Sequence, residues 1–596
     1  MDTGLDTGLE ADTLFHDDPQ SPVATPVPPP VPGQQKPPPP PSPGQQRDPP
    51  TGPAQQSRPP PTQSGGSGPL SPDEKRKPEN KRRAEAVKAA FIHSWEPYRD
   101  FGLPDDELRP ASREPYSTRN GWGASAIDAL STAIIMNLPG PVNEILQHVR
   151  GTDFSKSNTK TSVSLFETTI RYLGGLISGH DLLTEIDGRK RMVKDPNDIK
   201  VLVTKAKQLA DRLSIAFNTT SGVPYNELNW EMNGPDKPLD YATTTNNLAT
   251  VGTLILEWTR LSALTNNDRY KHLAHNAEMF LLLPTSWGAT DGGKTKDIVE
   301  PFPGLVGFDI FIKNGTFKNG YGSWSGGADS FYEYLLKMWM YNASPSNLIF
   351  RDRWIKAVES SMRNVASHPI TGVNNITLMQ SWQADRRKGN FSQHLTCFDG
   401  GNILLGGQVL NRRDFIRFGR HLVDGCRHTY AATPTGIGPE SFSWWSQDET
   451  SYKPPYFRTE SSAYVLRPEV LESYYYAYRI TGQTKYQDWA WEAFQAIEKY
   501  CRAEFGYSAI NNVNIEAKAQ DPEINKQLIR SNWRNEQESF WFAETLKYAY
   551  LIFADDDEEY QIPRGSGYSG LLLGRNRNKW VFNTEAHPIR VAGIPQ

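Results

Sequence analysis

Cysteine, basic charge and long apolar runs are all scarce in this sequence of 596 residues. Its three cysteines are too few for a disulfide-dense scaffold. A net charge of −4 gives no basic surface that would point to a nucleic-acid partner. No apolar run approaches the roughly 20 residues of a membrane span, and the acidic start, MDTGLDTGLEADTLFHDD, has neither the basic nor the apolar region of a signal peptide. These absences argue against a disulfide-framework protein, a nucleic-acid-binding protein and an integral membrane protein.

Aromatic residues, in contrast, make up 11% of the chain, with 16 tryptophans and 25 tyrosines. Aromatic rings suit the apolar faces of sugars as well as a protein core, so their abundance is only a first indication. By spacing alone, Cys397 and Cys426 are able to pair and leave Cys501 free, but three buried thiols are an equal alternative. Glycosylation sequons, which support a secretory route only weakly, occur at Asn218, Asn314, Asn342, Asn375 and Asn390.

The first 84 residues consist mainly of Pro, Gly, Gln and Ser, as in PVPPPVPGQQKPPPPPSPGQQ. Such a segment buries too little apolar surface to offset its ordering entropy, so we expect a disordered or polyproline arm over residues 1–84. A plain spacer is favoured over a set of PxxP ligands for partner domains. The charged run PDEKRKPENKRRAEAVKAAF then leads into a folded domain, which we place at residues 85–596.

Helical periodicity continues through most of the folded domain. Six stretches are apolar on most faces, as buried helices are: GWGASAIDALSTAIIM, SVSLFETTIRYLGGLISG, NNLATVGTLILEWTRLSAL, ADSFYEYLLKMWMY, PEVLESYYYAYRITG and ESFWFAETLKYAYLIF. More amphipathic stretches, such as DIKVLVTKAKQLADRLSIAF and KYQDWAWEAFQAIEKYCR, alternate with them. This alternation predicts an all-α fold with inner and outer rings of an α/α toroid. Seven pairs result if GGNILLGGQVL is an inner helix, but periodicity alone does not fix that number.

Carboxylates interrupt four of the apolar helices. Glu167 lies inside SLFETTIRYL with Arg171 one turn later, and Asp329 and Glu333 repeat this step in ADSFYEYLL. The other helices carry Glu469 and Glu472, with Arg467 just ahead, and Glu538 and Glu544 on either side of Phe540. Any one pair is explained well by a structural ion pair. Four charged apolar helices are harder to explain in that way, because each buried charge costs several kcal/mol unless it is compensated.

Several of these carboxylates lie at expected helix starts. Pro468 suits the first turn of a helix, which would put Glu469 at its N-terminus, and Gly326 and Gly327 precede Asp329. Parallel inner helices would gather these carboxylates at one mouth of the toroid, where crowding and desolvation separate their pKa values. Carboxylates at one mouth with aromatic neighbours are typical of a glycosidase site.

With these segments in order, the chain resembles the class I α-1,2-mannosidases of glycoside hydrolase family 47, and within them the fungal enzymes. The motifs that carry the resemblance run from about residue 88 to residue 590: GWGASAIDAL, SLFETTIRYLGGL, SGVPYNELNW, ADSFYEYLLK, HLTCF, GIGPESFSW, YVLRPEVLES, ESFWFAETLKYAYLIF and FNTEAHP. The resemblance implies an (α/α)7 barrel that a C-terminal β-hairpin plugs, a calcium cofactor, and removal of terminal α-1,2-linked mannose from high-mannose N-glycans with inversion.

The resemblance also implies roles for individual residues. Glu167 would be the general acid, acting through a water, and Glu469 the base, while the role of Asp329, the third essential carboxylate, is less settled. Residues that would line the sugar pocket are Arg171, His394, Glu440, Arg467 and Phe540, although a core histidine is the usual explanation for a lone His394. The family's disulfide would join Cys397 to Cys426.

The end of the chain, VFNTEAHP, carries a polar motif where a frayed terminus is usual. In the family this motif holds calcium, so Thr584 would bind the ion directly through its carbonyl and hydroxyl oxygens. Glu472, Glu544 and Glu585 would hold the waters that complete the coordination shell.

Two positions depart from the family pattern. The usual DxLDT step has Ser131 in place of its second acid, and the A-E-[IV] step has Thr250 in place of its glutamate. That glutamate helps to bind substrate, which puts affinity or branch preference in doubt. Fungal relatives also carry a signal or an N-terminal membrane anchor followed by a stalk, so we expect that this sequence begins within the stalk of an incomplete gene model.

The leading expectation is therefore a monomeric glycosidase of the endoplasmic reticulum, the Golgi or the extracellular space, bound to a membrane only through an anchor that this sequence does not contain. One alternative is a lectin of glycoprotein degradation on the same toroid, with weak or no activity. A second is a scaffold that acts through the proline-rich arm.

Overall fold

The computed structural model describes residues 72–230, 243–285, 299–370, 376–447, 457–556, 558–565 and 578–592. Residues 1–71 of the expected proline-rich arm and the sequon at Asn375 lie outside these residues. None of the helices within the described ranges combines the length and the apolar character of a bilayer span.

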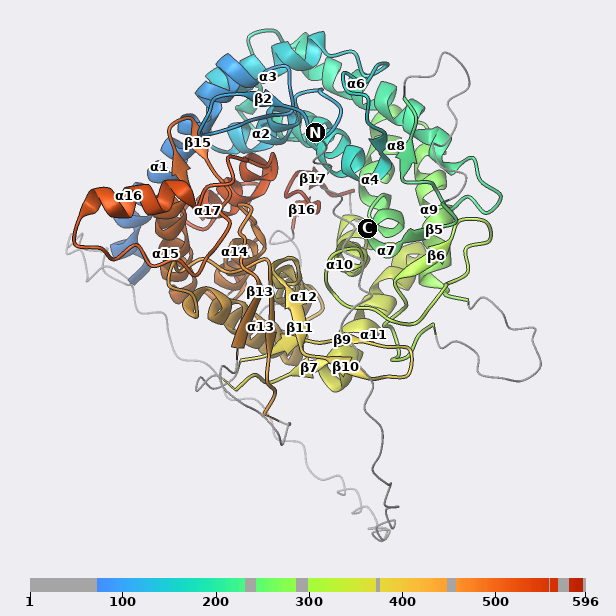
Figure 1. The fold of residues 1–596 in the computed structure, drawn as a ribbon. Helices are drawn as coiled ribbons and strands as arrows, with labels where there is room; N and C mark the ends of the chain where they lie inside the picture. Colours follow the sequence, from blue (N-terminus) through green and yellow to red (C-terminus); the bar gives the residue numbers. More distant parts are fainter. Residues whose placement is uncertain are drawn as a thin grey trace, which may run out of the picture. The chain divides into compact units, whose positions relative to one another are not determined.

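Helix pairs form a ring around a common axis in residues 72–592 (Figure 1). The ring is an (α/α)7 barrel, as the sequence predicts. Within the described residues the pairs are, inner helix first, α2 (Ala124–Ile135) with α3 (Pro139–Gly151), α5 (Gly174–Glu185) with α6 (Asn197–Leu213), α8 (Ile255–Thr265) with α9 (Arg269–Leu282), α10 (Asp329–Tyr341) with α11 (Leu348–Asn364), α12 (Phe398–Val409) with α13 (Arg413–Ala431), α14 (Glu469–Thr481) with α15 (Lys485–Tyr500), and α17 (Leu546–Leu551) with α1 (Pro72–Pro97).

The seventh pair joins the two ends of the folded chain. Helix α1 packs beside α17, although the sequence pattern assigned its residues only to a charged entry segment. The expected boundary at residue 84 lies inside this helix, because Arg76 and Arg83 both pair with Asp488 on α15. These ion pairs and the packing against α17 hold the charged segment of α1 against the rest of the folded domain.

Short segments precede four of the inner helices. They are α4 (Leu165–Glu167) and η2 (Thr168–Leu173) before α5, α7 (Leu248–Gly252) before α8, η6 (His394–Cys397) before α12, and η7 (Trp541–Thr545) before α17. Both η2 and η7 are π-helical, and such wide turns often occur at functional sites. The remaining helical segments are α16 (Pro522–Ser531), η1 (Tyr98–Gly102), η3 (Arg189–Met192), η4 (Ser214–Phe217) and η5 (Pro345–Asn347).

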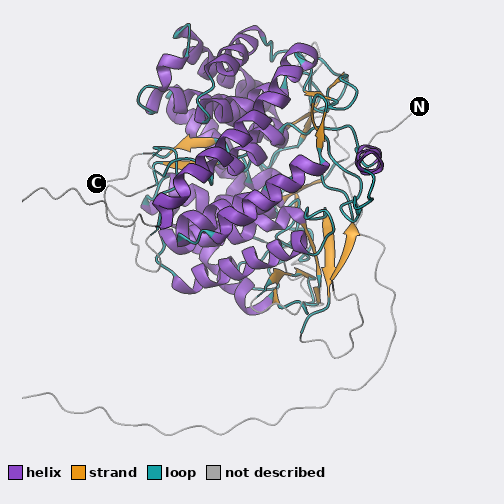
Figure 2. Ribbon diagram, turned by 90° about the vertical axis from the view of Figure 1, so that its left-hand side faces the viewer, coloured by secondary structure: helices purple, strands orange, loops and turns teal. Residues whose placement is uncertain are grey.

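Seen from the side, most of the short strands gather at one end of the ring (Figure 2). The largest sheet of the described residues is antiparallel, with the order β11 (Phe391–Gln393), β12 (Ser441–Trp444) and β13 (Phe457–Ser461). The other short strands are β1 (Glu107–Leu108), β2 (Pro115–Tyr116), β3 (Val163–Ser164), β4 (Glu227–Leu228), β5 (Thr245–Asn247), β6 (Asp309–Phe311), β7 (Ala366–Ser367), β8 (Leu378–Met379), β9 (Ser381–Trp382), β10 (Lys388–Gly389), β14 (Arg502–Ala503) and β15 (Gly506–Tyr507).

The terminal hairpin lies at the centre of the ring (Figure 1). Its strands β16 (Trp580–Phe582) and β17 (Pro588–Arg590) are antiparallel, and they contact α10 and α5. Helix α5 begins with glycine because the hairpin approaches closely: a Cβ on Gly174 would lie 2.6 Å from the side-chain nitrogen of Asn583. The end of the described chain is therefore part of the barrel core.

Candidate active site

Three carboxylates lie at or just before the starts of inner helices, as the sequence predicts for Asp329 and Glu469. Asp329 and Glu469 are the first residues of α10 and α14, and Glu167 ends the first turn of α4. A helix N-terminus carries a partial positive charge and so favours a carboxylate at this position. We call Glu167, Asp329, Glu440 and Glu469 the mouth cluster.

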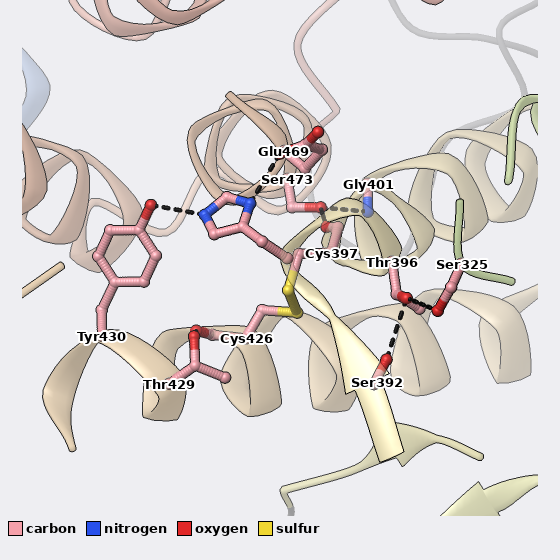
Figure 3. Close-up of a disulfide and its surroundings, with 11 residues drawn as sticks. Ser325, Ser392, Thr396, Cys397, Gly401, Cys426, Thr429, Tyr430, Glu469 and Ser473 are labelled. Carbon is pink, nitrogen blue, oxygen red and sulfur yellow. Dashed lines mark hydrogen bonds and ion pairs between the residues drawn. A yellow bond between two sulfur atoms is a disulfide. The ribbon is translucent and has the colours of Figure 1, made fainter. Parts of the chain in front are cut away.

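Glu469 accepts a hydrogen bond from His394, whose Nδ1 lies 2.7 Å from the carboxylate. Since a carboxylate only accepts, Nδ1 carries a proton, and Nε2 lies 2.8 Å from the Tyr430 hydroxyl. A disulfide between Cys397 and Cys426 connects η6 to α13, the segments that carry His394 and Tyr430 (Figure 3). The disulfide implied by the resemblance is present, and Cys501 is a buried free thiol.

Arg467 connects Glu469 to Glu440. Its Nε lies 2.8 Å from both Glu440 oxygens, and its guanidinium lies 3.8 Å from Glu469. Burial alone would raise the pKa of Glu469, but the hydrogen bond from His394 and the charges of His394 and Arg467 outweigh burial and lower it. Glu469 is therefore ionised at neutral pH, as a general base has to be.

Glu167 is surrounded by guanidinium groups. Its carboxylate lies 2.7 Å from Nε of Arg171 and 3.5 Å from Nε of Arg119. Burial opposes ionisation here too, but the charges of Arg119, Arg171 and Arg467 lower the pKa of Glu167 to about 2. The guanidiniums of Arg171 and Arg467 lie 5.7 and 6.0 Å from the centre of the Phe540 ring. One aromatic ring thus adjoins cationic partners of both Glu167 and Glu469.

Asp329 behaves differently from the rest of the mouth cluster. Burial and the charges of Glu333 and Glu469 raise its pKa to about 7, although the Ser330 backbone N–H donates to the carboxylate at 2.8 Å. Near neutral pH this carboxyl group still holds a proton for part of the time.

The turn that carries Thr584 is fixed on every side. The Asn583 side chain accepts hydrogen bonds from the backbone N–H groups of Glu585 and His587. Its amide donates to Glu257 at 2.8 Å. The Thr584 N–H donates to the Tyr334 hydroxyl at 3.1 Å. Within the described residues, no hydrogen bond ends on the carbonyl or hydroxyl oxygen of Thr584, so both are left for another partner.

Two buried lysines bind carbonyl groups in the same turn as Thr584. Lys337 lies 3.4 Å from the Asn583 carbonyl oxygen, and Lys547 lies 2.6 Å from that of Ala586. These two carbonyls therefore have donors, whereas within the described residues the Thr584 carbonyl has none. We call Thr584 together with Glu472, Glu544 and Glu585 the floor cluster.

The floor cluster fits a hard cation such as calcium. Burial, followed mainly by neighbouring carboxylates, raises the pKa of Glu544, and burial is also the main cause of the raised pKa values of Glu472 and Glu585. Crowded carboxylates and unpaired Thr584 oxygens are the donor chemistry that calcium prefers. Within the described ranges, no three His, Cys, Asp or Glu side chains are placed to bind a metal together. A site of one protein ligand and several waters would not contain such a group.

Ser131, one of the two departures from the family pattern, lies beneath this turn. It accepts from Lys547 at 2.8 Å and lies 3.0 Å from Nδ1 of His587. The other His587 nitrogen lies 3.2 Å from Asp128. Burial lowers the pKa of Lys547 to about 7. A neutral hydroxyl thus joins a buried ammonium group to the hairpin at this position.

Thr250, the other departure, is buried in α7, where its N–H donates to the Asn247 side chain at 2.9 Å. The sequence reasoning missed several polar residues of the site: Arg119, Lys337, Lys547, Asp128 and His587. Arg119 lies in a loop with no helical pattern, and His587 lies in the turn of the terminal hairpin. Asp128 and the two buried lysines lie in apolar helices but were not counted alongside the other charged groups.

The sequence and the structure of this chain are similar to those of known proteins. The sequence profile described as Glycosyl hydrolase family 47 matches residues 90–591. The mannosyl-oligosaccharide alpha-1,2-mannosidase 1B of Aspergillus oryzae is 49% identical over 515 residues, which cover 86% of this chain and 92% of that protein. The mannosyl-oligosaccharide alpha-1,2-mannosidase of Coccidioides posadasii is 47% identical over 520 residues, covering 86% and 91%. Among solved structures, the alpha-1,2-mannosidase from Trichoderma reesei superposes with a TM-score of 0.76 at 40% identity, covering 86% of this chain and 99% of that one.

Proposed function

This chain belongs to glycosyl hydrolase family 47 and is a mannosyl-oligosaccharide α-1,2-mannosidase, and we propose that it removes terminal α-1,2-linked mannose from high-mannose N-glycans in an inverting, calcium-dependent reaction. The observation that carries the proposal is the pairing of Glu469 with His394 and Arg467. This pairing keeps the base ionised, and the Arg467 guanidinium also lies 6.0 Å from the centre of the Phe540 ring, an aromatic surface that suits a sugar face.

Glu469 is the proposed base that activates the attacking water. Its ionisation is supported by the His394 hydrogen bond, and the disulfide supports the position of that histidine. An inverting mechanism needs a second carboxyl group on the other side of the sugar, with space for a water. Glu167 is the candidate, because Arg171 and Arg467 join it to Glu469 around Phe540.

The acid proton is proposed to reach the leaving oxygen through water, with Glu167 and Asp329 sharing the role. Glu167 is ionised in the free protein at neutral pH, whereas Asp329, with a pKa of about 7, holds a proton. If protonated Asp329 is required, kcat/KM falls as the pH rises through about 7. The variant Asp329→Asn should lose that limb of the pH profile together with most of the activity, whereas an unchanged limb would remove Asp329 from the acid role.

Thr584 is the proposed direct ligand for calcium, and Glu472, Glu544 and Glu585 hold its waters. When bound, the ion would orient sugar hydroxyls and neutralise the floor carboxylates. Arg171, His394, Glu440, Arg467 and Phe540 are proposed to line the sugar pocket. Roles for all of these residues rest on the family resemblance and on the contacts described above.

The cellular location and the oligomeric state of the protein are also proposals. A disulfide is stable in an oxidising lumen, which supports action in the secretory pathway or outside the cell. We propose a monomer whose catalytic domain is independent of the proline-rich arm.

The test uses a defined nine-mannose glycan. The wild-type protein should release mannose, and either chelation by EDTA or Glu469→Gln should stop the release. Deletion of residues 1–71 should leave the rate unchanged. Glycan binding without release by the wild-type protein would instead identify a lectin, and loss of function on deletion of the arm would favour a scaffold.

A further inference from the structure

The loop between β2 and α2 holds the backbone of Arg119 in one position. The Arg119 N–H donates to the buried carboxylate of Asp106 at 3.0 Å, and its carbonyl accepts from the hydroxyls of Thr159 and Thr161 at 3.3 and 3.1 Å. Asp106 is itself fixed, because it also accepts from the Trp122 N–H and the Tyr172 hydroxyl. A loop residue whose backbone is held from both sides projects its side chain in a defined direction.

That direction is toward the mouth cluster. The Nε atom lies 3.5 Å from Glu167, and the terminal nitrogen lies 3.8 Å from Glu538 on the other side. At these distances the opposite charges attract each other, but both distances exceed that of a normal hydrogen bond. Arg119 therefore has a carboxylate on each side without being hydrogen-bonded to either.

The guanidinium group still has its donors available. Within the described part of the chain the side chain of Arg119 donates no hydrogen bond, and its Nε is shielded from solvent without a partner. A guanidinium has five N–H donors, and a buried donor left without a partner costs free energy. This group is therefore ready for an acceptor that the protein does not supply.

Solvent exposure places Arg119, together with Glu167 and Glu538, nearer the solvent than Arg171. The side chains of Arg119, Glu167 and Glu538 are 21, 30 and 26% exposed, whereas those of Arg171 and Glu585 are 6 and 5% exposed. Burial thus increases from Arg119 to Arg171 and the floor cluster. A terminal mannose held beside Phe540 would direct the sugar to which it is bonded toward the more exposed end.

We propose that Arg119 binds a hydroxyl of the sugar that leaves, the mannose to which the terminal residue is attached, with Glu538 accepting from a neighbouring hydroxyl. This inference rests on the proposed function, since it names a further contact of the same site. The guanidinium supplies donors and the two carboxylates supply acceptors, which together match the vicinal hydroxyls of a pyranose. Arg119 is in this account a substrate-binding residue and not a part of the acid–base pair.

The experiment compares two ligands by calorimetry on the full chain with calcium. One is an α-1,2-mannobiose with sulfur in place of the bridging oxygen, and the other is a monosaccharide iminosugar with the mannose configuration. Arg119→Gln should weaken disaccharide binding about tenfold, the effect of one lost hydrogen bond to a charged group. It should change monosaccharide binding less than twofold, and Arg119→Lys should fall between the two proteins.

The matched control is Arg109→Gln, in the turn between β1 and β2. The guanidinium of Arg109 lies 4.5 Å from the centre of the Tyr116 ring and donates to the Asn535 carbonyl, so it already has partners within the protein. This variant should bind both ligands as the wild type does. Equal weakening of both ligands by Arg119→Gln, or no weakening of either, overturns the inference. If Arg119→Gln does not fold, the ratio of the two affinities in Arg119→Lys decides in the same way. A wild-type protein that binds neither ligand would contradict the proposed function itself.

Discussion

The mouth and the floor of the barrel both gather carboxylates, but they stabilise these groups differently. At the mouth, Glu167, Glu440 and Glu469 each lie within 4 Å of an arginine or a histidine. On the floor, Glu585 also lies 2.8 Å from Arg171, but burial outweighs such partners and raises the pKa values of Glu472, Glu544 and Glu585. Cationic side chains thus keep Glu167 and Glu469 ionised at the mouth, whereas on the floor they leave the carboxyl pKa values raised, at the place where we propose that calcium binds.

The comparison teaches how one barrel separates two tasks. Ionised, oriented carboxylates serve acid–base chemistry, and crowded carboxylates attract a divalent ion. Asp329 is an exception at the mouth, because its pKa of about 7 leaves it partly protonated. The following changes either remove the difference between the two regions or increase it.

The largest effect is expected at the mouth. Glu469→Gln keeps the size of the side chain but removes the base, so kcat should fall by about 10²–10⁴-fold. Mannose release from α-1,2-mannobiose measures the loss. Glu460→Gln, in the exposed strand β13, is the control and should retain full activity. A Glu469→Gln protein with more than a tenth of the wild-type rate would place the base elsewhere.

Calcium removal should have the next largest effect, through the floor. Chelation should abolish activity and lower the unfolding temperature by several degrees, because an ion at 100 times its Kd contributes about 2.7 kcal/mol. The dependence on pH has a definite sign. A carboxyl group whose folded pKa is raised costs stability as pH rises from its unfolded value through its folded value. Stabilisation by calcium should therefore be larger at pH 8 than at pH 5, and thermal unfolding at both values checks this. Equal stabilisation at the two values would contradict the charge balance assigned to the floor.

Loss of the disulfide should affect the mouth more than the floor. Cys397→Ser opens a loop with a sequence separation of 29, which corresponds to about 3–4 kcal/mol of unfolding free energy. Because the bond connects the segments of His394 and Tyr430, kcat should also fall about tenfold while calcium affinity is kept. Denaturant unfolding and calcium titration separate the two effects. Cys501→Ser, at the free thiol, is the control, and a lower calcium affinity in Cys397→Ser alone would show that the regions are coupled.

The smallest effects are expected from restoring the family residues. Thr250→Glu at the mouth should lower KM about two- to fivefold, the effect of one added hydrogen bond. Ser131→Asp on the floor should give Lys547 a carboxylate partner and raise stability by about 1 kcal/mol with little change in KM. Kinetics and unfolding of both variants form a matched pair. An exchange of the two outcomes would contradict the division into mouth and floor.

Much of the barrel could be predicted from the sequence because its inner helices are apolar on most faces. The starts of α10 and α14 followed from the glycines before Asp329 and from Pro468. The partner of α17 could not be predicted in this way, because α1 is charged and lies about 450 residues away along the chain, where periodicity carries no information on contact.

The site was predictable only in part for a related reason. Carboxylates in apolar helices stand out from their neighbours, and motif resemblance supplied the Cys397–Cys426 pair. Nothing in the sequence around Arg119 marks it as a site residue. Its role becomes visible only in the structure, where the hydrogen bond to Asp106 fixes the loop that carries it. The π-helical turns η2 and η7 likewise have no sequence signature, since their wider hydrogen bonding depends on packing.

The most direct test of the account is a proton NMR time course of mannose released from α-1,2-mannobiose, recorded with calcium, after chelation and after calcium is restored. The account predicts that β-mannose appears first, that release stops on chelation and that it returns with calcium. Release of α-mannose first, or an undiminished rate without the ion, would contradict the assignment of acid–base chemistry to the mouth cluster and of calcium binding to the floor cluster.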